Sequence, residues 1–129
     1  MLHREGRAFV DAIHEHAGVF DVIVVDGAAF RYDCSVEAIT KLASGGMIIL
    51  DDSEALPNTA RALRAAGLIQ VDFAGFAAFE PRVQTTSLLL HPKFEFAPIG
   101  GTQPHRIVGG VGRRVVSADY PDNVLPTNA

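Results

Sequence analysis

The chain has 129 residues, of which 48% are hydrophobic and 20% are charged, a composition typical of one folded domain and unlike that of disordered chains. Its formal net charge is -4 and its 11 Lys and Arg residues are scattered. We therefore expect no nucleic-acid partner, because phosphate binding needs a clustered basic surface. The apolar runs at 22–25 and 88–90 are far shorter than the ~20 residues of a membrane span, so we expect no membrane partner.

Cysteine content and the N-terminal residues bear on the cellular compartment. Cys34 is the single cysteine, so the chain offers no internal disulfide. Glu5, Asp11 and Glu15 fall where a secretory signal would need an apolar run. We therefore expect a cytoplasmic protein.

The first two expected elements are a helix and a strand. Apolar residues recur at helical spacing in residues 5–16, and Gly18 follows, so we expect a short amphipathic helix there. Residues 20–26 (Phe-Asp-Val-Ile-Val-Val-Asp) form an almost unbroken β-branched run. Such a run is typical of a strand that is covered on both faces in a parallel sheet.

A second helix and strand follow directly. Apolar residues are spaced by three and four over 33–43, and Ser-Gly-Gly at 44–46 indicates the end of that helix. Residues 47–50 are a fully apolar strand that ends in Asp51 and Asp52. Two such strands joined by a helix predict a right-handed βαβ unit with parallel strands.

The next segment predicts a third helix and a hairpin. Pro57 begins a helix that reaches residue 66, with Gly67 as its stop. Residues 69–73 alternate apolar with polar, which indicates a strand with one wetter face. The β-prone segment 85–90 follows across a loop of about ten residues, a length that favours an antiparallel hairpin over a helical crossover. We expect a domain over 1–97 and an extended C-terminal tail over 98–129, with one weak strand at 113–117.

Four segments carry a family resemblance. They are Glu-Gly-Arg-Ala-Phe at 5–9, Phe-Asp-Val-Ile-Val-Val-Asp-Gly at 20–27, Gly-Gly-Met-Ile-Ile-Leu-Asp-Asp at 45–52 and Ala-Ala-Gly-Leu-Ile at 65–69. In this order they resemble the C-terminal half of the class I S-adenosylmethionine-dependent methyltransferases, over roughly residues 4–92. The resemblance implies a partial Rossmann-like α/β sheet of two parallel strands with helices plus a C-terminal antiparallel hairpin. The rival on pattern alone is another doubly wound fold, against which the closing hairpin argues.

The chain also departs from this family. The family's first three strands, and the glycine-rich turn that lets the cofactor approach, have no counterpart before Glu5. The glycines at 109, 110 and 112 are read as a flexible turn rather than a relocated cofactor loop. We therefore expect this chain to bind S-adenosylmethionine weakly or not at all.

The resemblance nevertheless assigns cofactor-binding positions. Glu5 matches the acidic residue that contacts the adenine amino group, and Gly6 permits close approach. Asp26 and Gly27, at the end of the first strand, complete this set. For Glu5, a solvated glutamate in the first helical turn is the alternative.

Three carboxylates are the strongest chemical signal. Asp26, Asp51 and Asp52 end neighbouring parallel strands, and ligands of open α/β sheets bind outside the carboxyl ends of strands. The catechol O-methyltransferase branch is similar in holding magnesium with two Asp and an Asn; here Asp52 stands where the Asn would be. Such oxygen ligands suit Mg²⁺, which lowers the pKa of a substrate hydroxyl. The alternative is that these carboxylates cap helices and bind loop amides.

Two functions remain open from the sequence. The first is the parent activity of the family, methyl transfer to the hydroxyl of a small-molecule substrate. The second is a non-catalytic fragment or interaction module. Because strand 20–26 lacks its first family neighbour, its edge needs a partner. We expect a homodimer, with the tail near 113–117 or a separate N-terminal half as alternatives. Arg31, Tyr32 and Cys34 are not selected for chemistry by any pattern.

Overall fold

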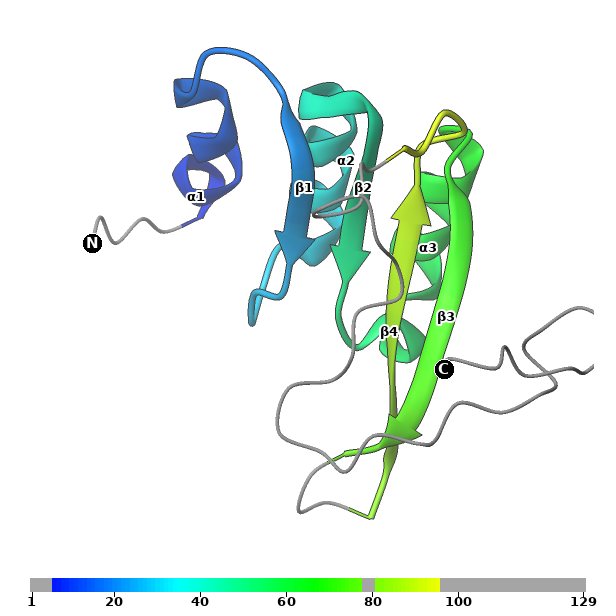
Figure 1. Ribbon diagram of the computed structural model, residues 1–129. Coiled ribbons are helices and arrows are strands. Elements are labelled where there is room, and N and C mark those ends of the chain that lie inside the picture. The colour runs from blue at the N-terminus through cyan, green and yellow to red at the C-terminus, as the bar shows by residue number, and fades with distance from the viewer. Residues whose placement is uncertain (1–5, 78–80, 96–129) are drawn as a thin grey trace, which may run out of the picture. The chain divides into compact units, whose positions relative to one another are not determined.

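The computed structural model describes residues 6–77 and 81–95 (Figure 1). In these residues a mixed sheet of four strands has the order β1-β2-β4-β3. β1 and β2 are parallel, and β4 is antiparallel to both β2 and β3. The expected α/β class, parallel pair and closing hairpin are confirmed, and β4 lies between β2 and β3. The strands are β1 (Phe20–Val25), β2 (Leu42–Leu50), β3 (Ile69–Phe76) and β4 (Val83–Leu90).

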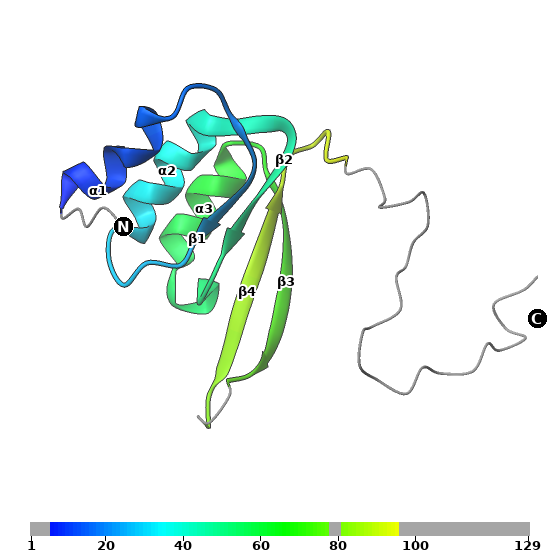
Figure 2. The ribbon, with the colours of Figure 1, turned by 60° about the vertical axis from the view of Figure 1, so that its left-hand side comes forward.

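The helices lie on one face of this sheet (Figure 2). They are α1 (Arg7–Asp11), α2 (Arg31–Lys41) and α3 (Pro57–Ala65), with 3-10 turns at Ala12–Glu15 and Ser53–Ala55. Among the helices described, none is long and apolar enough to span a membrane.

The core lies between the sheet and helices α2 and α3. Ile48 and Leu50 of β2, Leu89 of β4 and Leu63 of α3 are completely buried, and Ala38 of α2 is nearly so. Side chains directly opposite in neighbouring strands share a face, and Ile48 pairs with Leu89. Burial of each large aliphatic side chain stabilises the fold by about 1.5–3 kcal/mol.

The other face of the sheet is apolar but carries no described helix. Ile69, Val71 and Phe73 of β3 are 54%, 39% and 60% exposed. The polar residues between them face the helices, since Gln70 and Asp72 pair with the buried Leu89 and Ser87. The predicted alternation in β3 is confirmed, and the apolar side chains lie on the uncovered face.

The strand β1 was expected to be covered on both faces, but the structure covers only one. Val22 and Val24 are 40% and 61% exposed, whereas Val25 is buried. The strand is therefore covered on one face, because the helices lie on that face alone. Among the described strands β1 pairs only with β2, which places it at an edge of the sheet.

Several boundaries also differ. The first helix ends at Asp11 and tightens into a 3-10 turn. β2 begins at Leu42, five residues before the predicted start, because Gly45 and Gly46 continue the strand instead of ending a helix. Glu5, the glycines at 109–112, the strand expected at 113–117 and the tail 98–129 lie outside the described residues, so the predicted domain boundary stays a prediction.

Candidate functional site at the carboxyl edge of the sheet

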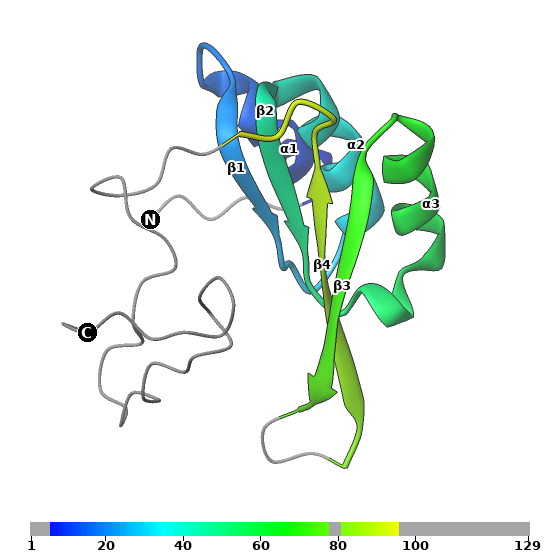
Figure 3. The same cartoon turned by 45° about the vertical axis from the view of Figure 1, so that its right-hand side comes forward.

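The carboxyl ends of β1 and β2 lie side by side. Val25 pairs with Leu50, and the amide of Asp51 donates to the carbonyl of Val25 at 3.2 Å. Asp26 therefore follows β1 next to the place where Asp51 and Asp52 follow β2. The hairpin of β3 and β4 projects past these ends (Figure 3), because β4 pairs with β2 only from Ser87 onward.

Arg31, the first residue of α2, connects the two strand ends. Its Nη2 lies 3.3 Å from Oδ1 of Asp26 and 3.3 Å from Oδ2 of Asp52. Nη1 donates to the carbonyl of Asp51 at 2.6 Å, and Nε donates to the carbonyl of Gly27. The Arg31 side chain is only 16% exposed, so its charge is largely removed from water at this position.

The hairpin binds one carboxylate oxygen of Asp52 and one of Asp51. Nε2 of Gln84 donates to Oδ1 of Asp52 at 3.0 Å, and the Thr86 hydroxyl donates to Oδ1 of Asp51 at 2.8 Å. Asp51 thus directs its carboxylate to β4, while Asp26 and Asp52 are bridged by Arg31. The carboxylates of Asp26 and Asp52 both lie 3.3 Å from the same atom, Nη2 of Arg31, so these two side chains are close together as predicted.

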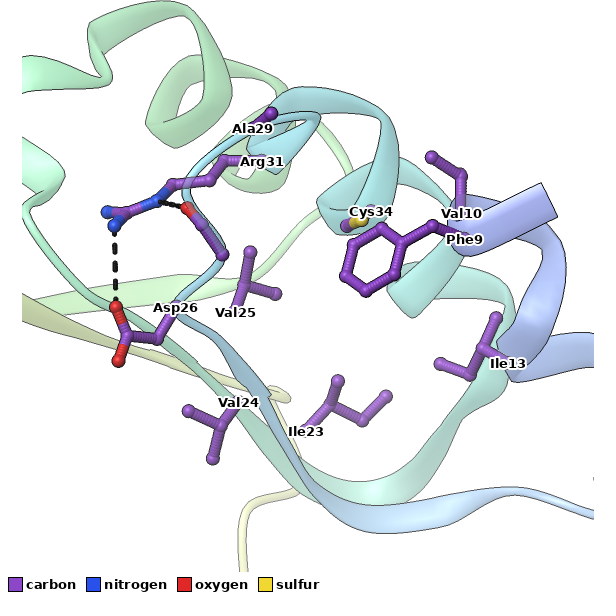
Figure 4. Close-up of a pocket in the computed structure, with 11 residues that line it drawn as sticks. Phe9, Val10, Ile13, Ile23, Val24, Val25, Asp26, Ala29, Arg31 and Cys34 are labelled. Atoms are coloured by element: carbon purple, nitrogen blue, oxygen red, sulfur yellow. Dashed lines mark hydrogen bonds and ion pairs between the residues drawn. The ribbon is translucent and has the colours of Figure 1, made fainter. Parts of the chain in front are cut away.

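A cavity of about 350 Å³ opens beside this cluster (Figure 4). One wall is formed by Phe9, Val10 and Ile13 of the N-terminal helical segment, and the opposite wall by β1. Asp26 and Arg31 stand together at one end, where Figure 4 shows their ion pair. The cavity is therefore apolar along its length and charged at the carboxyl end of β1. Its lining is Phe9, Val10, Ile13, Ile23, Val24, Val25, Asp26, Gly27, Ala29, Arg31 and Cys34.

Cys34 contributes a thiol to this lining. Burial raises the pKa of the Cys34 thiol, and the negative charge of Asp33 raises it further. A thiol with a raised pKa is protonated at neutral pH and is a poor nucleophile. Cys34 is consequently a group of the cavity lining and not a candidate nucleophile.

Two glycines of the predicted cofactor set are described. Gly6 has φ +60° directly before α1, a conformation that favours glycine. At Gly27, a Cβ would lie 3.3 Å from the carbonyl oxygen of Ala29 and 3.9 Å from the Phe9 ring. The absence of a side chain at Gly27 therefore leaves room in the cavity lining beside Phe9. The cofactor roles of Gly6 and Gly27 stay predictions.

The magnesium ion that the resemblance implies does not fit this arrangement. Among the residues with described positions, no group of three or more His, Cys, Asp or Glu side chains is placed to hold a metal. The Arg31 guanidinium donates to the carboxylates of Asp26 and Asp52, and the carboxylate of Asp51 accepts a hydrogen bond from the Thr86 hydroxyl. No step of the proposed chemistry is therefore assigned to a metal.

Comparison with known proteins adds one structural likeness. No family model and no curated protein matches the chain. The crystal structure of a methyltransferase from Pyrococcus furiosus is similar, with 24% sequence identity and a TM-score of 0.41. The match covers 58% of this chain and 42% of that one, so the chain spans less than half the length of that protein. A likeness of this extent does not assign a function.

Sequence reasoning placed Asp26, Gly27, Asp51 and Asp52 at this edge but missed Arg31. A usable signal was present, because Arg31 is the one basic residue between Asp26 and Lys41. A single basic residue five positions after Asp26 is close enough in sequence to form an ion pair with that carboxylate. Gln84 and Thr86 carried no such signal, since their role depends on where the hairpin pairs.

Proposed function

We propose that the chain is a methyltransferase-type domain whose parent activity is methyl transfer from S-adenosylmethionine to a small-molecule hydroxyl. The observation that carries this proposal is the cavity of about 350 Å³ at the carboxyl end of β1. Ligands of open α/β sheets bind at this end of the strands. Asp26 and Gly27, which the sequence resemblance assigns to the cofactor, both line it.

The lining suits a ligand with one aromatic ring and one polar end. Phe9, Val10 and Ile13 offer an apolar wall for a flat ring. At the other end Oδ1 of Asp26 bonds Arg31, while Oδ2 has no partner among the described residues. That oxygen is available to accept a hydrogen bond from a ligand hydroxyl or amino group.

The cavity is small for the whole methyl donor. Pockets for small molecules typically have volumes of about 300–1,000 Å³, and this cavity lies near the lower limit. The glycine-rich turn of the resembled family has no counterpart in the described residues. We therefore propose that this chain alone holds one part of S-adenosylmethionine and binds it weakly.

A titration with S-adenosylhomocysteine, followed by amide NMR, tests this function. We expect a Kd of about 1 mM or weaker, equivalent to about -4 kcal/mol, with shifts grouped at Gly27, Ala29 and Cys34. Gly27→Ala adds a methyl group to the cavity lining and is expected to weaken these shifts, whereas Gly75→Ala, on open β3 backbone, leaves them unchanged.

Two results would contradict this proposal. Shifts grouped away from the cavity, or none at all, would remove its support. Saturable binding in the low micromolar range would instead show that this chain holds the whole cofactor, against the weak binding proposed.

The second candidate is a non-catalytic interaction module. It is favoured by the edge position of β1, where Val22 and Val24 are 40% and 61% exposed. A strand edge that carries apolar side chains is a template for pairing with another chain. Absence of ligand-induced shifts together with stable self-association would favour this function over methyl transfer.

A further inference from the structure

The position of Arg31 shows how this edge of the sheet balances its negative charge. Four oxygen atoms surround its guanidinium, from the carboxylates of Asp26 and Asp52 and from the carbonyls of Gly27 and Asp51. Carboxylate and carbonyl oxygens are also the ligands that a hard divalent cation takes. The guanidinium therefore fills the place that such a cation would need.

The local structure holds Arg31 there firmly. Phe30, which precedes it, has a left-handed conformation with φ +59° and turns the chain into α2. The carbonyl of Phe30 then accepts a hydrogen bond from the amide of Cys34 at 2.8 Å, which begins the helix. Arg31 thus extends from the first turn of a helix that is anchored in the core through Ala38.

The acceptors are fixed as well. Asp52 has φ +50° and its second carboxylate oxygen is bonded to Gln84. A divalent ion would need either displacement of the guanidinium or reorientation of these carboxylates. Displacement would leave a largely buried charge without its partners, which is costly.

We propose that Arg31 is the resident cation of this site, in the place that the resembled enzymes give to magnesium. Arg31 is a positioning residue: it sets the separation of Asp26 and Asp52 and holds the Gly27 carbonyl beside the cavity. The site accordingly binds its ligands without a divalent ion. This inference rests on the proposed function, which places the ligand site at this edge of the sheet.

The experiment compares Mn²⁺ binding by the whole chain and its Arg31 variants, from paramagnetic broadening of amide signals. The wild type shows no localised broadening at Gly27, Asp51 and Asp52. Arg31→Ala exposes the oxygen cluster, and Mn²⁺ then broadens those signals at concentrations at least roughly tenfold below the highest concentration that leaves the wild-type signals unbroadened. Arg31→Lys restores a cation and suppresses the broadening.

Further variants exclude a general effect of charge. In Arg31→Ala combined with Asp52→Asn, one carboxylate is lost and the Mn²⁺ signal disappears. If Arg31→Ala does not fold, Arg31→Gln keeps donor groups without the charge and provides the same test.

Localised, saturable broadening in the wild type would overturn the inference, as would a folded Arg31→Ala or Arg31→Gln variant that binds no Mn²⁺. The readout needs no S-adenosyl ligand. Failure of the proposed function in the titration with S-adenosylhomocysteine is therefore distinguishable from failure here.

Discussion

The hydroxyl of Ser87, which is completely buried in β4, lies 2.6 Å from Oδ1 of Asp72 on the neighbouring strand β3. The Ser87 hydrogen bond lowers the pKa of Asp72, and Gln70, whose Nε2 is 2.7 Å from the same oxygen, lowers it further. Ser53 completes the cluster, with its Oγ 2.6 Å from that of Ser87.

Ser87→Ala is expected to raise the pKa of Asp72 towards its ordinary value, because the strongest donor to the carboxylate is lost. Titration of the Asp72 carboxyl carbon by NMR measures the change. Thr86→Ala is a matched control on the adjacent residue, since Thr86 bonds Asp51 instead. An Asp72 pKa that is unchanged in Ser87→Ala would show that Gln70 and the charge of Arg64 lower it without Ser87.

The same pair predicts a pH dependence of stability. The folded-state pKa of Asp72 is depressed, so its contribution is present above the pKa of an unfolded aspartate, about 3.9. It is lost as the pH falls through the lower folded-state value. Urea unfolding between pH 7 and pH 2 is expected to show a smaller acid-dependent loss in Ser87→Ala than in the wild type. Equal losses would assign the acid sensitivity to other carboxylates.

Truncation in the core gives a direct test of the packing. Leu63 of α3 is completely buried in the cluster that includes Ile48, Leu50 and Leu89. Leu63→Ala is expected to lower the free energy of unfolding by about 2–5 kcal/mol, from lost burial and the cavity left behind. Arg61→Ala on the exposed side of α3 should change it by less than about 0.5 kcal/mol. Urea denaturation measures both, and equal effects would contradict the orientation of α3.

Gly45 is expected to tolerate no side chain. Its φ is +87°, and a Cβ would lie 2.9 Å from the carbonyl oxygen of Lys93. Gly45→Ala therefore combines a strained backbone with a clash, and should cost more than about 1 kcal/mol of stability. Gly75→Ala, with nothing within 4 Å of its added Cβ, is the matched control in β3. An equal loss of stability in both variants would show that the cost does not come from the backbone conformation and the Lys93 contact of Gly45.

Local patterns predicted the elements of this fold because each pattern reflects a local property. The β-branched run at 20–26 and the spacing over 33–43 are sufficient for a strand and a helix wherever they pack. The insertion of β4 between β2 and β3 is not local, because it depends on which strand of the hairpin reaches β2. The burial of β1 was misjudged because an apolar run does not say whether a second layer covers it.

The site likewise combines positions that local patterns predict with contacts that depend on the whole fold. Asp26, Asp51 and Asp52 follow strands that could be identified, so their common edge could be predicted. Their contacts could not, because Arg31 and Asp52 are 21 positions apart in sequence, with α2 and β2 between them, and meet only once these elements have packed. A long side chain that bridges two strand ends leaves no periodic signal.

The last prediction concerns the free edge of β1. Pairing of this strand with the same strand of a second copy would give a two-fold symmetric, continuous sheet. Such pairing would satisfy the main-chain groups at the edge and cover part of Val22 and Val24, which are 40% and 61% exposed. The tail segment 113–117 is the less favoured partner, because its valines are few and a glycine precedes them.

We therefore expect a dimer in light scattering at micromolar concentration. Val24→Lys places a charge on the edge and should yield a monomer, because a lysine there opposes strand pairing. Phe73→Lys is the matched control, since Phe73 is 60% exposed on the opposite edge strand β3. Dissociation by Phe73→Lys alone would move the interface to β3. A wild-type monomer would rule out the dimer. Resistance to hydrogen exchange in that monomer at those amides of residues 22–25 that point away from β2 would then show that the edge is covered within the chain, because the other amides of this strand are already paired with β2.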